Sequence, residues 1–420
     1  MTAPATNGIL QTAMWNVEQT AKRLNLNADL TRRIIEPAEQ IRTAIHPQIP
    51  DGPMLHARVF VVRHNDVLGP AKGGIRMTAS VSLEEVTGLA MEMTWKTSLI
   101  GVPFGGGKAG ICYDTTGLKP TQKEVLIRAF TRGVRRHIGP EIYVPAPDMG
   151  TNEHDMGHIR DCISYSAGTS IPVGCFVTGK PVVLGGIVGR REATGNGVVA
   201  TIVSACERLN MQVSKLRVSV QGFGNVGSVA ALAIADLGAT VVAASDVTGG
   251  TFNKDGLDVK KLADYVNQTG GVKGFSGGKD VSLDEVLEAD CDVLIPAAGG
   301  SSITEKNAPC IKAKIIAEGA NAPVTPAGDK ILDDRKVFII PDILCNAGGV
   351  FVSYLEYTQE TQRDQMTREE VDARLNQRMK TTFEQVYARS QNMKETMRHA
   401  AMDIAVTRVV DGILSRGLLP

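Results

Sequence analysis

The spacing of hydrophobic residues changes near the middle of the chain. Beyond about residue 184, short apolar runs recur with helical stretches between them, as in alternating strands and helices. Most of these runs are apolar throughout, as expected for parallel strands that are covered on both faces. The second half therefore predicts an α/β domain with a parallel sheet. The predicted strands are 216–221, 240–245, 292–296, 314–317 and 337–340.

The first half mixes helical and strand-like patterns. From about Trp15 to Ile45 the pattern predicts a helix, which a proline-rich run over 47–53 ends. Residues 58–63 carry β-branched and aromatic side chains and predict a strand. Ser82 and Glu85 have the spacing of a capping box, which marks the start of a helix. This half therefore predicts a mixed α/β domain.

The two ends of the chain have different patterns. Residues 1–8 have no periodicity and predict a loose tail. Thr367 and Glu370 form a second capping box, and the apolar stripe that follows over 371–386 predicts a long helix. A last helix is predicted around 400–410. Such stripes usually serve core or subunit packing.

Two glycine-rich segments interrupt the first half, and each carries a lysine. Residues 69–76 contain Lys72, and residues 103–110 contain Lys108 after three consecutive glycines. Glycine permits tight turns and close approach of the main chain to a ligand, so both segments predict turns. Lys96 lies near the end of the helix between them. The three lysines could converge on one anionic small molecule, or they could be ordinary solvated side chains.

Asp148 follows two prolines and precedes a glycine, on a rigid and irregular segment. That setting suits a carboxylate that transfers protons, although an aspartate in such a place is more often a turn former or a helix cap. His154 and His158 are four residues apart and could share a metal ion. A third ligand at suitable spacing is lacking, so exposed histidines are favoured and no metal site is predicted.

The strongest single motif is Gly222-Phe223-Gly224-Asn225-Val226-Gly227. It follows a predicted strand, opens a predicted helix, and precedes by 24 positions an acidic residue, Asp246, at the end of the next strand. This is the full context of a dinucleotide-binding fingerprint. Gly222 permits the turn, Gly224 lets the backbone approach the pyrophosphate, and Gly227 allows helix and strand to pack closely. Asp246 would bond the ribose hydroxyls and repel a 2′-phosphate, which favours NAD while leaving NADP possible.

Composition and charge narrow the class of protein. A chain of 420 residues with 43% hydrophobic and 21% charged residues predicts two globular domains. Lysine plus arginine equals aspartate plus glutamate, 45 each, which argues against a nucleic acid or an anionic membrane as the main partner. No apolar run approaches a membrane span, and no signal peptide is recognisable. Seven single cysteines without a CxxC pair favour a reducing compartment, and we expect the cytoplasm.

Taken together, the motifs resemble the glutamate dehydrogenase branch of the Glu/Leu/Phe/Val dehydrogenase family, from about residue 15 to the C-terminus. The order of the motifs matches as well as their content. The matching segments are 69–74, 94–96, 103–108, 145–148, 191–195, 222–227 and 346–353. The resemblance implies a mixed α/β substrate and assembly domain over 1–183, a Rossmann-type NAD(P)-binding domain over 184–380, and C-terminal helices over 381–420 that return to the first domain.

The resemblance also implies residue roles. Lys108 would be the catalytic lysine and Asp148 the carboxylate that shuttles protons. Lys96 would bind the substrate α-carboxylate, Lys72 and Ser353 the distal carboxylate, and Met93 would line the same pocket. The implied cofactor-binding residues are Thr194, Gly222, Gly224, Asn225, Val226, Gly227, Asp246, Asn321 and Asn346.

The implied reaction is the reversible oxidative deamination of L-glutamate to 2-oxoglutarate and ammonium, with hydride transfer to NAD(P) in a cleft between two domains. Members that act on leucine, valine or phenylalanine have apolar residues where Lys72 and Ser353 stand. A cation and a hydroxyl there would be left unpaired by an apolar side chain, so glutamate is favoured. The alternatives are a branched-chain or aromatic amino-acid dehydrogenase and a non-catalytic nucleotide-sensing subunit.

One segment departs from the family pattern. Residues 299–302 read Gly-Gly-Ser-Ser, where the family has a bulkier pair followed by asparagine. The segment follows a predicted strand of the nucleotide domain, so the departure concerns the cofactor contacts and leaves the lysines untouched. Relatives of this kind are usually hexamers, and by that likeness we expect a homohexamer.

Overall fold

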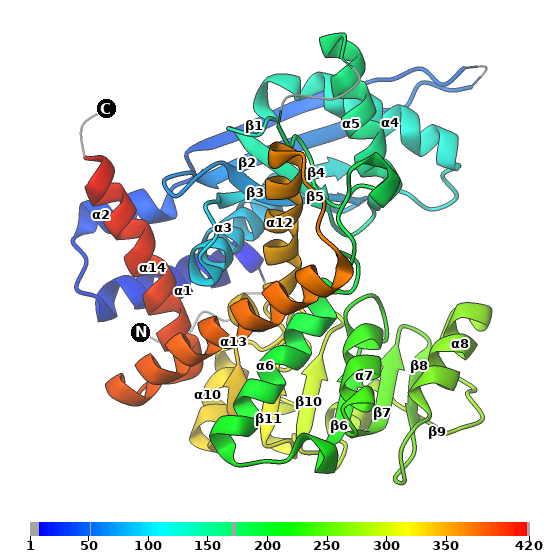
Figure 1. Ribbon diagram of the computed structural model, residues 1–420, viewed down its shortest axis with the longest axis vertical. Coiled ribbons are helices and arrows are strands. Elements are labelled where there is room, and N and C mark those ends of the chain that lie inside the picture. The colour runs from blue at the N-terminus through cyan, green and yellow to red at the C-terminus, as the bar shows by residue number, and fades with distance from the viewer. Residues whose placement is uncertain (1–7, 51, 170–173, 418–420) are drawn as a thin grey trace. The chain divides into compact units, whose positions relative to one another are not determined.

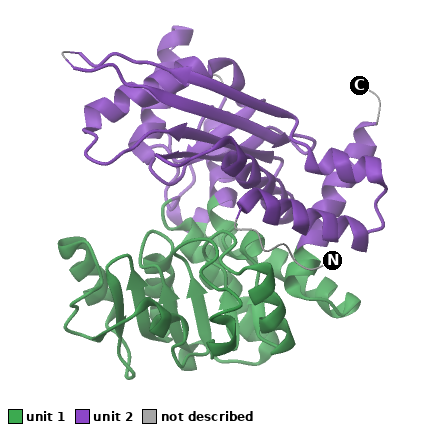
Figure 2. Ribbon diagram, turned by 180° about the vertical axis from the view of Figure 1, so that it is seen from behind, with its two compact units in different colours: residues 1–3, 191–349, 372–401 green, residues 4–190, 350–371, 402–420 purple. Residues whose placement is uncertain are grey.

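The computed structural model describes residues 8–50, 52–169 and 174–417 of the chain. These residues form two compact units (Figure 2). Unit 1 comprises residues 191–349 and 372–401, and unit 2 comprises the described residues of 4–190, 350–371 and 402–420. Both units are built of sheets and helices (Figure 1), so the predicted α/β class is confirmed. Among the helices of the described ranges, none has the length and apolar character needed to cross a membrane.

Unit 2 contains a five-stranded mixed sheet in the order β1-β2-β4-β3-β5. The first three strands in that order are antiparallel, and β4, β3 and β5 are parallel. Along β2, alternate side chains enter two cores: Val59 and Val61 pack with α4 and α5, and Phe60 and Val62 pack with the start of α3. Both faces of the sheet are therefore covered. The strands are β1 Glu39–Ile45, β2 Ala57–Asn65, β3 Ala71–Thr78, β4 Gly105–Cys112 and β5 Tyr143–Pro147.

The helices of unit 2 come from both ends of the chain. Ser82 caps α3 by accepting a hydrogen bond from the Glu85 backbone N–H, as predicted, but the Glu85 carboxylate bonds Arg76. Short 3-10 helices lie at Arg135–His137 and Val182–Leu184. The α-helices are α1 Ile9–Arg23, α2 Ala28–Ile35, α3 Leu83–Ile100, α4 Pro120–Gly133, α5 Glu153–Ala167, and two that begin in unit 1, α12 Gly348–Gln362 and α14 Met397–Arg416.

Two predictions for the first half are wrong, the single helix over 15–45 and the turns at the glycine-rich segments. The helix predicted over 15–45 is two helices followed by strand β1, whose alternating exposed and half-buried residues fit an edge strand. The two glycine-rich segments predicted as turns are largely the parallel neighbours β3 and β4. The predicted tail over 1–8 falls almost wholly on residues 1–7, outside the described residues, and Gly8 is the N-cap of α1.

Unit 1 contains a seven-stranded sheet in the order β12-β11-β10-β6-β7-β8-β9. The strands from β12 to β7 are parallel, and β8 and β9 extend the edge in antiparallel fashion. All five strands predicted for this half are present. They are β6 Arg217–Gln221, β7 Thr240–Asp246, β10 Val293–Pro296, β11 Ile315–Ala317 and β12 Phe338–Ile340, and β8 is Gly249–Phe252 and β9 Lys279–Val281.

Helices and turns connect these strands as in a doubly wound fold. Val242, Leu294 and Ile316 from three strands share one core with Ile303 and Leu332. The helices are α6 Ala193–Leu209, α7 Gly227–Asp236, α8 Val259–Thr269, α9 Leu283–Leu287, α10 Pro326–Asp334, α11 Asp342–Cys345 and α13 Arg368–Met393, with 3-10 turns at Val213–Lys215 and Ala308–Cys310. The capping box predicted at Thr367 and Glu370 is formed at the start of α13.

Candidate functional site

Glycines let α3 and the strands β3 and β4 approach each other closely. A Cβ atom added to Gly106 would lie 2.0 Å from Thr94 Oγ1, and one added to Gly73 would lie 1.7 Å from the Gly107 carbonyl oxygen and 3.3 Å from Met93 Cγ. Side chains larger than hydrogen are therefore excluded where the helix meets the strands. This packing places Met93 beside β3. Lys96, one helical turn further, is 7% exposed.

Lys108 on β4 forms an ion pair with Asp148, which directly follows β5. The Lys108 Nζ atom lies 2.8 Å from Asp148 Oδ2, and the lysine is 5% exposed. Arg76 on β3 donates to the same oxygen from its Nε atom at 3.1 Å. Two cations from two neighbouring strands thus converge on one carboxylate oxygen.

The charges around Asp148 determine its protonation state. Burial alone would raise the pKa of Asp148, but the positive charges of Lys108 and Arg76 outweigh that effect and lower the pKa to about 2. Thr151 Oγ1 accepts a hydrogen bond from the Asp148 backbone N–H. Asp148 is therefore held as an anion in a fixed position.

Lys72 has a different environment, although it also lies in the sheet. Its side chain is among the largest fully buried ones, and no hydrogen bond or ion pair to its amine occurs among the residues that the structure describes. Burial, and next the charge of Arg190, lower the pKa of Lys72 to about 7. A buried lysine amine without a bonded carboxylate is suited to an anionic ligand.

Ser353 lies on α12 and is 1% exposed. Arg190 Nε donates a hydrogen bond to Ser353 Oγ at 2.8 Å. Burial lowers the pKa of Arg190, and Glu356 counteracts part of that shift. The charge of Arg190 also lowers the pKa of Lys72, so the guanidinium that binds Ser353 lies close enough to Lys72 to affect its protonation.

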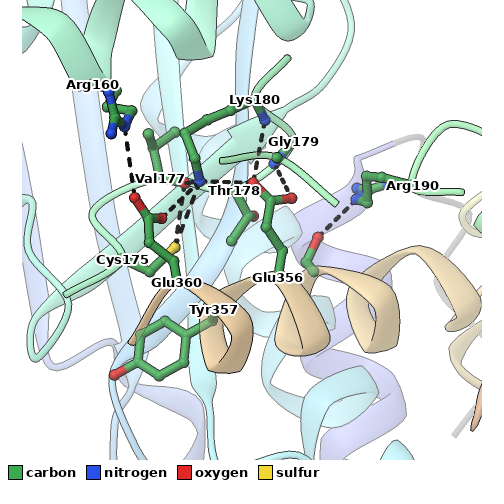
Figure 3. A network of polar contacts seen from close by, with 12 residues as sticks. Arg160, Cys175, Val177, Thr178, Gly179, Lys180, Arg190, Glu356, Tyr357 and Glu360 are labelled. Carbon is green, nitrogen blue, oxygen red and sulfur yellow. Dashed lines mark hydrogen bonds and ion pairs between the residues drawn. The ribbon is translucent and has the colours of Figure 1, made fainter. Parts of the chain in front are cut away.

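A buried ion network holds the segment before Arg190 against α12. Figure 3 shows the Lys180 amine between the carboxylates of Glu356 and Glu360. The Lys180 Nζ atom lies 2.7 Å from Glu356 Oε1 and 2.9 Å from Glu360 Oε2. Glu356 also accepts hydrogen bonds from the backbone N–H groups of Gly179 and Lys180. Burial alone would lower the pKa of Lys180, but Glu356, Cys175 and Glu360 raise it above its usual value. This network fixes the helix that carries Ser353.

The glycine fingerprint of unit 1 adopts the geometry that its sequence predicts. Gly222 has φ +95°, and a Cβ atom there would lie 2.6 Å from the Ala298 backbone nitrogen. A Cβ atom at Gly227 would lie 1.9 Å from the Gly222 carbonyl oxygen. Around Gly224 there is open space within 4 Å, beside the first turn of α7. The segment fits the pyrophosphate of a dinucleotide, because the backbone is accessible where helix α7 begins.

Asn321 and Asn346, which are also predicted to bind the cofactor, follow the carboxyl ends of β11 and β12 in the parallel sheet of unit 1. Asn346 Nδ2 donates to Asn321 Oδ1 at 3.1 Å and to the Ala320 carbonyl oxygen. Asn346 Oδ1 is buried and has no hydrogen-bond partner among the described residues. It is therefore an acceptor still available for an amide group such as that of nicotinamide.

Four further residues predicted to bind the cofactor lie where a helix begins or a strand ends in unit 1. Thr194 lies in the first turn of α6, and Asn225 and Val226 directly precede α7. Asp246 ends β7, and its carboxylate accepts hydrogen bonds from the backbone N–H groups of Thr248 and Val272 and from the Thr248 hydroxyl. The unusual segment 299–302 lies beside Asn321 and Ala322, and Gly299 has open space within 4 Å.

The structure separates the predicted residues by unit. Unit 2 contains those expected to bind substrate or react, and unit 1 contains those expected to bind the cofactor. Arg76, Arg190 and Glu356 were not predicted from the sequence. Arg76 could have been noticed, because it lies four residues after Lys72 and alternate residues of a strand share a face. No sequence pattern indicated a role for Arg190 or Glu356. Their partners are distant in sequence, because Arg190 binds Ser353 and Glu356 binds Lys180.

The family pattern described as Glu/Leu/Phe/Val dehydrogenase, dimerisation domain, matches residues 37–165, and the pattern described as Glutamate/Leucine/Phenylalanine/Valine dehydrogenase matches residues 185–417. The chain is similar to the NAD-specific glutamate dehydrogenase of Staphylococcus aureus, with 38% identity over 98% of this chain and 99% of that protein. It is 41% identical to the glutamate dehydrogenase of Thermotoga maritima, with the same coverage.

Solved structures give the same result. The hetero-hexameric glutamate dehydrogenase of Thermus thermophilus, in a leucine-bound form, superposes with a TM-score of 0.94 at 30% identity over 100% of both chains. The glutamate dehydrogenase of Peptoniphilus asaccharolyticus gives a TM-score of 0.85 at 32% identity, covering 98% of this chain and 100% of that one. The likeness therefore extends over both units.

Proposed function

The chain belongs to the Glutamate/Leucine/Phenylalanine/Valine dehydrogenase family. From that membership we propose which of its residues bind the substrate, bind the cofactor and transfer protons. Its function is that of an NAD-dependent glutamate dehydrogenase, like that of the relatives it matches along nearly their whole length. The reaction converts L-glutamate, water and NAD into 2-oxoglutarate, ammonium, NADH and a proton. The residue roles below are our proposal.

The distal carboxylate of glutamate binds at Lys72 and Ser353. The observation that supports this assignment is the buried Lys72 amine, which has no carboxylate bonded to it within the described part of the chain. A leucine or phenylalanine side chain would leave that charge unpaired, at a cost in free energy. Arg190, bonded to Ser353, adds a second positive charge beside the same group. Lys96 binds the α-carboxylate, and Met93 lines the pocket.

Lys108 and Asp148 carry out the proton transfers. After hydride removal from Cα, the substrate is an iminium ion, and Lys108 takes a proton from the water molecule that attacks it. Asp148 moves protons to and from the nitrogen as ammonia leaves. The ion pair at 2.8 Å supports these roles, because the two groups can exchange a proton directly.

The cofactor fits the carboxyl edge of the unit 1 sheet. Gly222, Gly224 and Gly227, with Asn225 and Val226, would hold the pyrophosphate, and Asp246 would bind the adenosine ribose. Thr194, Asn321 and Asn346 would hold the nicotinamide end. When bound, NAD accepts the hydride; the protein residues bind and orient it.

Assembly and location complete the proposal. We propose residues 1–183, together with the C-terminal helices over 381–420, as the substrate and assembly domain, residues 184–380 as the NAD-binding domain, and a homohexamer. The match of a dimerisation-domain pattern to residues 37–165 and the hetero-hexameric Thermus relative support this assembly. None of the seven cysteines, all of which lie among the described residues, forms a disulfide, which supports a reducing compartment such as the cytoplasm.

Initial rates of NADH and NADPH oxidation with ammonium test the proposal, with 2-oxoglutarate and 2-oxoisocaproate as competing substrates. We expect a strong preference for 2-oxoglutarate and for NADH. A preference for 2-oxoisocaproate would show that Lys72 and Ser353 do not select a distal carboxylate. Tight NADH binding without turnover of either substrate would indicate a nucleotide-sensing subunit.

A further inference from the structure

Arg76 is shared between two carboxylates. Its Nε atom lies 3.1 Å from Asp148 Oδ2, and its Nη1 atom donates to Glu85 Oε1 at 2.6 Å. The Arg76 side chain is only 15% exposed. Glu85 lies in the first turn of α3, and its backbone N–H is bonded to Ser82, so its position is fixed by the helix cap. Strand β3 and helix α3 together therefore hold the guanidinium in one orientation.

Charged or titratable side chains on the three strands β3, β4 and β5 lie near Asp148. Lys108 approaches from β4 and Arg76 from β3, and both contact the same oxygen. Tyr143 on β5 is buried nearby, and burial, with the Asp148 charge, raises its pKa, so it is neutral there. Glu85 does not contact Asp148 but binds the other side of Arg76. The charge that Arg76 presents to the Lys108–Asp148 pair is therefore partly neutralised by Glu85.

We propose that Arg76 and Glu85 are positioning residues that set the orientation and proton affinity of the Lys108–Asp148 pair, a role that rests on the proposed function of that pair. Because Arg76 and Lys108 bind one oxygen from two strands, Asp148 cannot rotate away from the lysine. Arg76 favours the ionised carboxylate, and Glu85 moderates that effect by binding the same guanidinium. Neither residue needs to touch the substrate.

The proposal predicts opposite effects of two substitutions. Arg76→Gln removes a positive charge, so the pair holds its protons to higher pH. Glu85→Gln removes the negative charge that partly neutralises Arg76. The positive charge of Arg76 then acts more strongly on the Lys108–Asp148 pair, so the pair loses its protons at lower pH. A purely structural contribution would weaken activity in both variants without moving the pH dependence in opposite directions.

The experiment measures kcat and kcat/KM for 2-oxoglutarate with NADH and ammonium from pH 5 to 10. In Arg76→Gln we expect the pH midpoint of the limb that reports the pair to rise by about one unit. In Glu85→Gln we expect a smaller fall. We also expect kcat in Arg76→Gln to drop by about 10- to 100-fold, with KM for 2-oxoglutarate nearly unchanged, since misorientation affects the reaction more than binding.

Two controls separate this role from others. Glu84→Gln removes the same charge from the same helical turn, but Glu84 is exposed and lies outside the network, so its profile should match the parent protein. Arg76→Lys keeps the charge and should move the midpoint back toward the parent value. If Arg76→Gln does not fold, the Glu85→Gln and Glu84→Gln profiles still decide the question.

An unmoved midpoint, or shifts in the same direction in both variants, would overturn the proposal. Failure of the proposed function is seen separately, as absence of 2-oxoglutarate turnover in the parent protein before any substitution. An active parent protein with insensitive profiles would leave the dehydrogenase assignment intact and remove Arg76 and Glu85 from the catalytic arrangement.

Discussion

Lys72 and Lys108 lie on neighbouring strands but have different electrostatic environments. In the register of β3 and β4, Lys72 pairs with Gly106, two residues before Lys108. Lys108 forms an ion pair with Asp148, whereas Lys72 has Arg190 as a charged neighbour and a pKa of about 7. Charge is therefore balanced around Lys108 and in excess around Lys72.

The difference teaches how one sheet can support two kinds of chemistry. A balanced pair can exchange a proton internally without a large change in net charge, which suits repeated acid and base steps. An unbalanced buried cation is unfavourable until an anion arrives, so it contributes to ligand selection. Substitutions of the two lysines and their neighbours can show whether these two environments are as distinct in solution.

Lys108→Ala should have the largest effect, because it removes one member of the reactive pair. We expect kcat to fall by about 10³-fold or more, within or beyond the range typical of a lost acid–base group. NADH binding, followed by fluorescence titration, should stay nearly intact, since the predicted cofactor residues lie in unit 1. A variant that kept most of its turnover would remove Lys108 from the chemistry.

Lys72→Met should affect selectivity more than chemistry. Loss of a buried charge partner of a carboxylate typically costs about 2–5 kcal/mol, so kcat/KM for 2-oxoglutarate should fall by about 30- to 5,000-fold. With 2-oxopentanoate, which lacks the distal carboxylate, the same variant should lose little or gain. Equal losses with both substrates would contradict the assignment of Lys72 to the distal carboxylate.

The pH dependence of KM should also separate the two lysines. In the proposed role it is the protonated Lys72 amine that binds the carboxylate, so KM for 2-oxoglutarate should rise by up to about tenfold per pH unit above about pH 7. KM for 2-oxopentanoate should lack this rise. By the same linkage, the folded state binds fewer protons than the unfolded chain between about pH 7 and the usual lysine pKa of about 10.4. The contribution of Lys72 to the free energy of unfolding therefore increases with pH over that window.

Glu356→Gln should give the smallest effect and define how the Lys72 environment is set. The Glu356 carboxylate raises the pKa of both Lys72 and Arg190, so its removal should move the rise of KM to lower pH, by about half a unit or ~0.7 kcal/mol. Glu360→Gln is the matched control, since Glu360 also binds Lys180. If both variants moved the KM profile equally, the effect would arise from the Lys180 network and not from the Glu356 charge.

The sequence predicted unit 1 better than unit 2. Its parallel strands are short apolar runs, and the fingerprint combines strand, glycines and helix within one local segment. Each glycine there has a separate geometric reason, which the structure confirms at Gly222 and Gly227. Local patterns suffice when the structural requirement is itself local.

The glycines of β3 and β4 show why unit 2 was harder to predict. Glycine signals either a backbone turn or a close contact, and the sequence does not say which. At Gly73 and Gly106 the reason is contact with other segments, which depends on the folded neighbours. Likewise, the importance of Arg76 depends on Asp148, 72 residues away, and that of Arg190 on Ser353, 163 residues away.

The glycine contacts between α3, β3 and β4 also bear on laboratory evolution of substrate range. Random substitution at Gly73, Gly106 or Gly107 would place atoms within 3 Å of existing ones, so such libraries would yield mostly unfolded clones. Variation at Lys72, Met93 and Ser353, the residues proposed to line the substrate pocket, exchanges one side chain for another instead of adding atoms next to the backbone. Substitutions that change the substrate range and still allow folding are therefore expected at a few positions. A small library focused on those positions should sample most of them.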